Sequence, residues 1–220
     1  MRYGLTKFAD SPTGAVMSLA EAKLHLRVDH TADDDLISEL IEAATLDCEA
    51  YCNASFVSAT YHMTIGAFPA TGSGAFGPDE DGVEFPRGFG RSGRPTRYPS
   101  AICLPVHPVT GVNSITYKDD NGATQTLATS AYVVVTSQRP AFIVPATGTV
   151  WPVTYDHPEA VTISLDAGFA SIPRDIVAAV KLRLGSLYEN REDVLVAVQS
   201  SLLPMGSRAL LGKHRLWPLP

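Results

Sequence analysis

The spacing of apolar residues changes twice along this chain, and this change restricts the fold more than any other feature. Between residues 34 and 52, apolar side chains recur with the 3.6-residue period of an α-helix. Over residues 57–167 the period is two, which is typical of β-strands. The helical period returns after Ile172-Pro173. This order predicts an α+β fold in which N- and C-terminal segments form one helical bundle and a β domain is inserted between them in sequence.

Start and stop signals define the predicted helices. Ser18-Leu-Ala-Glu21 is a capping-box pattern that starts a short helix reaching about Arg27. A second helix starts at three acids, where a helix N-terminus favours negative charge, and ends near Asn53. We expect its apolar face to be formed by Leu36, Ile37, Leu40, Ile41, Ala44, Cys48, Tyr51 and Cys52. Ile172-Pro173 starts a third helix, with Pro at its first position, and a short basic segment covers residues 207–217.

About seven short strands are predicted over residues 57–167. Asp120-Asn-Gly122 is a strong hairpin signal, because both central residues tolerate positive φ. A second turn at Gln138-Arg-Pro140 is flanked by apolar runs at 132–135 and 141–144. Short strands joined by tight turns predict a small antiparallel β-sandwich or barrel.

The periods divide the chain into two predicted domains. Residues 1–56 and 169–220 form a helical core with a C-terminal docking segment, and residues 57–168 form the inserted β domain. Inside the β domain, residues 69–99 contain seven Gly and five Pro, which predicts a long loop. We expect this loop to contact another subunit or a further protein through four arginines, Arg87, Arg91, Arg94 and Arg97.

Charge is unevenly distributed along the sequence. The 220 residues include 17 Lys+Arg and 23 Asp+Glu, a net charge of −6, which argues against nonspecific nucleic-acid binding as the main role. Residues 1–54 hold 4 basic and 10 acidic side chains, whereas residues 199–220 hold three basic ones and no acid. The two ends of the chain therefore have opposite electrostatic character.

No motif in the sequence predicts catalysis, a cofactor or a metal site. The three cysteines (Cys48, Cys52 and Cys103) form no disulfide framework, which favours synthesis in a reducing cytosol. The four-residue spacing of Cys48 and Cys52 fits half a zinc site, but no second pair exists, so buried small side chains are the favoured interpretation. The sequence shows no signal-peptide pattern and no long apolar run, and we expect no membrane association.

A series of fragments resembles a known family. Residues 16–29, Val-Met-Ser-Leu-Ala-Glu-Ala-Lys-Leu-His-Leu-Arg-Val-Asp, are followed by an acidic cap and an Ile/Ala-rich helix. Leu104-Pro-Val-His-Pro-Val109, Trp151-Pro152 and Leu187-Tyr-Glu-Asn-Arg-Glu192 follow in order. In this order and spacing, the chain resembles head–tail connector (adaptor, or head-completion) proteins of long-tailed bacteriophages and gene transfer agents.

The resemblance implies a structural virion component with no catalytic role. It implies synthesis in the bacterial cytoplasm and assembly at the virion neck as a ring of copies, expected to be twelvefold. The ring would lie between the portal protein and a tail-side stopper or tail terminator protein, and would let double-stranded DNA pass without specific binding. Two alternatives are a soluble ligand- or carbohydrate-binding module and a capsid-associated enzyme. The sequence does not distinguish an infectious phage from a gene transfer agent.

Two sets of site residues follow from the resemblance. The C-terminal segment is expected to dock into the portal through Arg208, Leu210, Leu211, Lys213, Arg215, Leu216 and Trp217. Deleting residues 205–220 is expected to abolish portal binding and to leave a folded protein. An acidic face is expected to line the tunnel lumen or meet a neighbouring subunit through Asp33, Asp34, Asp35, Glu39 and Glu42.

Overall fold

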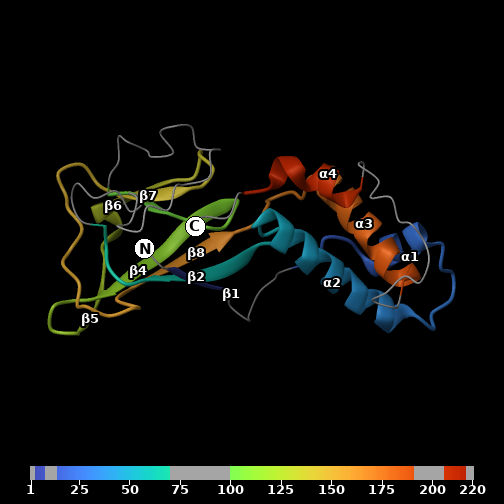
Figure 1. Cartoon of the computed structure of the whole chain (residues 1–220), viewed down its shortest axis with the longest axis horizontal. Coiled ribbons are helices and arrows are strands. Elements are labelled where there is room, and N and C mark those ends of the chain that lie inside the picture. Colours follow the sequence, from blue (N-terminus) through green and yellow to red (C-terminus); the bar gives the residue numbers. More distant parts are fainter. Residues whose placement is uncertain (1–2, 8–13, 70–99, 191–205, 217–220) are drawn as a thin grey trace, which may run out of the picture. The chain divides into compact units, whose positions relative to one another are not determined.

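The structure is a computed structural model that describes residues 3–7, 14–69, 100–190 and 206–216 (Figure 1). The chain divides into two units, which are described separately. The helical unit comprises Pro12–Val57 and Phe169–Arg215. The β unit comprises Met1–Ser11, Ser58–Gly168 and Leu216–Pro220.

The helical unit contains α1 (Leu19–Leu26), α2 (Asp34–Cys52), α3 (Arg174–Glu189), the short α4 (Ser207–Leu211) and a 3-10 turn, η2 (Gly212–His214). The predicted capping box starts α1: the Ser18 hydroxyl accepts from the Glu21 backbone N–H at 3.2 Å, and the Glu21 carboxylate accepts from the Ser18 N–H at 3.0 Å. Asn53 ends α2 in the left-handed conformation, with φ of 50°. The predicted start of α1 and stop of α2 are therefore present, whereas Pro173, predicted as the first residue of the third helix, is the N-cap of α3.

One apolar core holds the helices of this unit together. Both α2 and α3 bury one stripe, as the 3.6-residue period predicts. Segments far apart in sequence meet in this core, because α1 and α2 come before Ser58–Gly168 of the β unit, whereas α3 and α4 follow it. Its fully buried side chains include Ala22, Ile37, Ala44, Cys52, Phe56, Ile176, Ala179, Val180, Leu184 and Leu211.

The β unit contains two antiparallel sheets. The five-stranded sheet has the order β1 (Tyr3–Lys7), β2 (Ala59–Ile65), β8 (Val161–Ala167), β4 (Val109–Lys118), β5 (Thr124–Thr126). The three-stranded sheet has the order β3 (Ile102–Cys103), β7 (Phe142–Pro145), β6 (Tyr132–Val135), and a 3-10 turn, η1 (Thr129–Ala131), leads into β6. In β2 and β8 buried side chains alternate strictly with half-buried ones, because one face of the sheet covers the core.

Side chains from both sheets share one core, which makes the β unit a sandwich. Met63, Ile115 and Ile163 enter this core from the larger sheet, and Tyr132 and Ile143 enter it from the smaller one. The predicted α+β class, with helices from N- and C-terminal segments and an inserted antiparallel β structure, is confirmed.

Both predicted hairpins are present. The β4–β5 turn is closed by the Asp119 carboxylate, which accepts from the backbone N–H groups of Asn121 and Ala123, and Gly122 has φ of +78°. Strands β6 and β7 pair in the second hairpin.

Strand β1 was not predicted. The sequence analysis placed residues 1–56 with the helices, whereas Tyr3–Lys7 pairs with β2 in the five-stranded sheet. The strand is short and contains Gly4, so its own sequence carries little β signal. Its position is set by the edge of β2, which lies more than fifty residues away in sequence.

Candidate interaction surfaces

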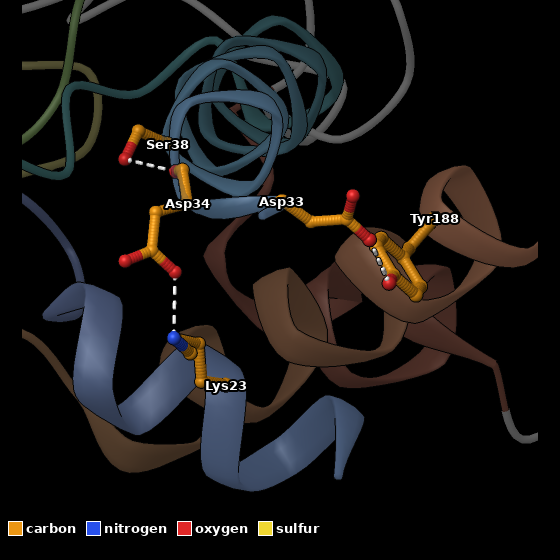
Figure 2. Close-up of polar contacts among 5 residues, drawn as sticks. All are labelled: Lys23, Asp33, Asp34, Ser38 and Tyr188. Atoms are coloured by element: carbon orange, nitrogen blue, oxygen red, sulfur yellow. Dashed lines mark hydrogen bonds and ion pairs between the residues drawn. The ribbon is translucent and has the colours of Figure 1, made fainter. Parts of the chain in front are cut away.

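The acidic start of α2 connects three helices (Figure 2). The Tyr188 hydroxyl, from α3, donates to an Asp33 carboxylate oxygen at 2.6 Å. The Lys23 ammonium, from α1, lies 2.6 Å from the Asp34 carboxylate, and both side chains are largely buried. Ser38 donates back to the Asp34 carbonyl at 2.8 Å. Asp33 and Asp34 thus fix the packing of α1, α2 and α3.

This arrangement separates the five acids that the sequence analysis grouped together. Asp33 and Asp34 bind groups of their own chain, because α1 and α3 bring Lys23 and Tyr188 to them. Asp35, Glu39 and Glu42 are exposed on α2 and have no hydrogen-bond or ion-pair partner within the described part of the chain. These three residues are called the acidic stripe, since positions 35, 39 and 42 share one face of a helix.

The C-terminal segment 206–216 packs onto its own chain. Leu211 is 1% exposed and belongs to the helical core, where its carbonyl oxygen lies 3.8 Å from the Cys52 sulfur. Leu216 is 6% exposed. Both leucines are buried within the chain here, and their role in docking to a portal stays a prediction.

Asp175, in the first turn of α3, binds the C-terminal segment. The Lys213 ammonium lies 2.8 Å from its carboxylate and the His214 Nε2 lies 2.7 Å from the same oxygen, Oδ2. Burial raises the pKa of Asp175, but hydrogen bonds from Lys213 and His214 outweigh this effect and hold the pKa at about 2. Asp175 is therefore ionised at neutral pH and fixes η2 against α3.

Two arginines of the same segment lie over one aromatic ring of α2. The Arg208 guanidinium carbon is 5.6 Å from the Tyr51 ring centroid, and that of Arg215 is 4.9 Å from it. Such cation–π contacts contribute roughly 0.5–1 kcal/mol each at exposed sites. Arg208 and Lys213 remain exposed to solvent. These two residues are called the basic patch.

The sequence analysis did not identify Tyr51 and Asp175 as partners of this segment. Tyr51 was placed on the apolar face of α2, and Asp175 lies in the ordinary position for an acid at a helix start. Neither position carries a signal for a partner that is more than 30 residues away. Of the other predicted residues, Leu210 is half-buried in the helical core. The loop arginines Arg87, Arg91, Arg94 and Arg97, and Trp217, lie outside the described residues.

The cysteines are buried free thiols. Burial raises the pKa of Cys48 to about 11 and those of Cys52 and Cys103 to about 12, so all three are protonated at neutral pH. This agrees with their interpretation as small core side chains.

Across the described residues, no group of three His, Cys, Asp or Glu side chains is arranged to hold a metal ion. A search of the same residues finds no helix of the length and apolarity that a membrane span requires.

A family model and several solved structures match this chain. Residues 16–92 match the model of the family described as phage gp6-like head-tail connector protein. We found no match among curated proteins.

Solved structures match over almost the whole chain. A chain in the neck of an empty GTA particle, computed with C6 symmetry, has 21% sequence identity and a TM-score of 0.71, covering 99% of this chain and 97% of that one. A chain in the virion of a native gene transfer agent (GTA) particle has 21% identity and a TM-score of 0.70, with coverages of 98% and 97%. A chain in the neck of a native GTA particle, computed with C12 symmetry, has 21% identity and a TM-score of 0.66, covering 99% of this chain and 97% of that one. The resemblance seen in the sequence is confirmed: residues 16–92 match the phage gp6-like head-tail connector family, and the chain has the fold of these GTA neck and virion proteins.

Proposed function

We propose that the protein is a structural virion component that forms an adaptor ring at the head–tail junction. The observation that carries this proposal is the agreement of two independent comparisons. The family model matches the first helices, and the fold matches neck-particle chains over nearly their full length. The symmetric necks of those particles support a ring of copies, for which twelve is the expected number.

In this role the ring joins the portal to a tail-side stopper or terminator protein and continues the DNA tunnel. The proposed role contains no catalytic step. The exposed acidic stripe supports it in either of two positions: at the tunnel wall its carboxylates would repel phosphate within a Debye length of roughly 8 Å at physiological salt, and at a subunit boundary they are available to a basic surface of the next copy.

Electron microscopy of the purified protein mixed with the portal protein of the same particle tests the proposal. A ring coaxial with the portal is the expected result. A monomer that leaves the portal bare would refute the adaptor role. As a second readout, isolated rings should bind double-stranded DNA weakly, and tight binding that falls steeply with salt would contradict the passage of DNA without retention.

A further inference from the structure

The helical unit carries two exposed patches of opposite charge. The acidic stripe consists of Asp35, Glu39 and Glu42 on α2, and the basic patch consists of Arg208 and Lys213 in the C-terminal segment. Within the described residues Arg208 has no carboxylate partner, and Lys213 keeps 68% of its side chain exposed beside Asp175. Both patches therefore have charge available for another molecule.

The two patches lie on different sides of α2 and do not neutralise each other in one chain. Arg208 is located by its contact with Tyr51. At 100° per residue, the Tyr51 position is about 150° around the helix from the acidic stripe. It also lies roughly 14–18 Å along the axis from Glu42 and Glu39, at 1.5 Å per residue. These separations exceed the screening length of roughly 8 Å, so the intramolecular attraction is weak.

The acidic stripe belongs to a helix face that can pack against protein. Leu46 follows Glu42 by one turn on the same face and is 50% exposed. Ala43 and Ala50 are exposed beside it. A half-exposed leucine bordered by carboxylates has the arrangement of an interface, in which an apolar contact is surrounded by a polar rim.

We propose that the acidic stripe of one copy binds the basic patch of the next copy. This inference rests on the proposed adaptor ring. A closed ring needs a heterologous contact, in which two different surfaces of the same chain are complementary, and the surfaces must lie on different sides of the subunit. The stripe and the patch meet both requirements: their charges are opposite, and they point away from each other around α2.

The portal is the competing partner for the basic patch. The sequence analysis assigned Arg208 and Lys213 to the portal, whereas the acidic stripe is a complementary surface present on the same helical unit. Because the proposed contact joins two copies, it predicts an effect that a portal contact does not: reversing the charge on one patch is compensated by reversing the charge on the other.

Charge-reversal variants test this prediction. Glu39→Lys with Glu42→Lys reverses the stripe, and Arg208→Glu reverses the patch without touching the Asp175 pairs. Asp156→Lys with Glu159→Lys, on exposed positions of the β unit, makes the same charge change as the stripe variant and is the matched control. Native mass spectrometry counts copies in the free protein and in complexes with the portal, and circular dichroism verifies that each variant is folded.

The wild type and the control are expected to form rings. The stripe variant alone, and the Arg208→Glu variant alone, should need more than about tenfold higher protein concentration to form rings, because like charges then face each other. A one-to-one mixture of the stripe and patch variants should restore rings in which the two alternate, since every contact then joins opposite charges. Carbodiimide coupling of the wild type should also join Lys213 to the α2 carboxylates of another copy.

Four results would overturn the inference. The contact would be excluded if the stripe variant and the Arg208→Glu variant formed rings as readily as the wild type. It would also be excluded if a mixture of the two variants failed to restore rings. Loss of portal binding by Arg208→Glu with normal ring formation would assign the patch to the portal instead. A wild type that forms no ring, with or without the portal, would refute the proposed function together with this inference.

Discussion

Replacement of Leu211 by Ala should destabilise the helical unit, although the residue lies in a C-terminal segment that the sequence analysis expected to be dispensable for folding. Leu211 is 1% exposed and packs in the same core as Ile37, Cys52 and Ile176. A buried Leu→Ala substitution costs about 2–5 kcal/mol, through lost apolar burial and the cavity that remains. We expect a value near 2–3 kcal/mol, because α4 is only five residues long and can shift to fill part of the space.

The matched control is Leu24→Ala on α1. Leu24 is 83% exposed, so the same chemical change should alter stability by less than about 0.5 kcal/mol. Far-ultraviolet circular dichroism during thermal unfolding follows the helical unit, whereas the fluorescence of Trp151, stacked on Phe68 at 4.9 Å, contributes a signal from the β unit. For a domain of fewer than 100 residues, 2 kcal/mol corresponds to a shift in Tm of roughly 8–16 °C.

Equal stability of the Leu211→Ala and Leu24→Ala variants would refute this reasoning. Such a result would mean that the C-terminal segment does not contribute to the folded helical unit in solution. The same measurement applies to deletion of residues 205–220, for which the structure predicts lost stability in addition to any lost binding.

Three further predictions follow from the contacts described above. Asp175→Asn should lower the stability of the helical unit by about 1–2 kcal/mol at neutral pH. The folded pKa of Asp175 is about 2, below its ordinary 3.8, so this contribution is present above pH 3.8 and is lost as the pH falls through about 2. In urea unfolding, a stability difference between variant and wild type that stays constant down to pH 2 would contradict this prediction. Tyr188→Phe should cost about 1–2 kcal/mol, since it removes the donor to Asp33, whereas Tyr155→Phe, at a tyrosine 49% exposed, should cost almost nothing in the same urea titration. Thiol reagents should modify the cysteines only after unfolding, because burial raises their pKa values to about 11–12, and rapid modification of the native protein would show that the cores open readily.

Local signals in the sequence predicted most of the secondary structure. The Ser18–Glu21 capping box, the Asn53 stop and the Asp-Asn-Gly turn each place their determining atoms within a few residues, so they form in the structure as the pattern indicates. Strand β1 escaped prediction because its partner, β2, is distant in sequence. Local propensity carries no information about that pairing.

The interaction residues were harder to predict for a related reason. An amphipathic segment such as residues 207–216 shows that one face will be buried, but its sequence does not say against which molecule. In the structure Leu211 is buried against the segment's own chain, and Tyr51 and Asp175 supply the contacts for its basic side chains. The same uncertainty applied to the acids of α2, of which two turned out to bind Lys23 and Tyr188.

The division of these acids changes the meaning of the chain's negative charge. Asp34 is paired with Lys23, which offsets its charge, and the Tyr188 hydroxyl fixes the Asp33 carboxylate inside the helical unit. Asp35, Glu39 and Glu42 are exposed, with no cation of the described residues beside them. If the stripe faces a neighbouring copy, the ring neutralises it and the tunnel must rely on other carboxylates to avoid holding DNA. If it faces the lumen, reversing it should create salt-sensitive DNA binding without affecting ring closure. The stripe variant Glu39→Lys with Glu42→Lys therefore distinguishes a subunit contact from a tunnel lining through two separate readouts, ring formation and DNA affinity.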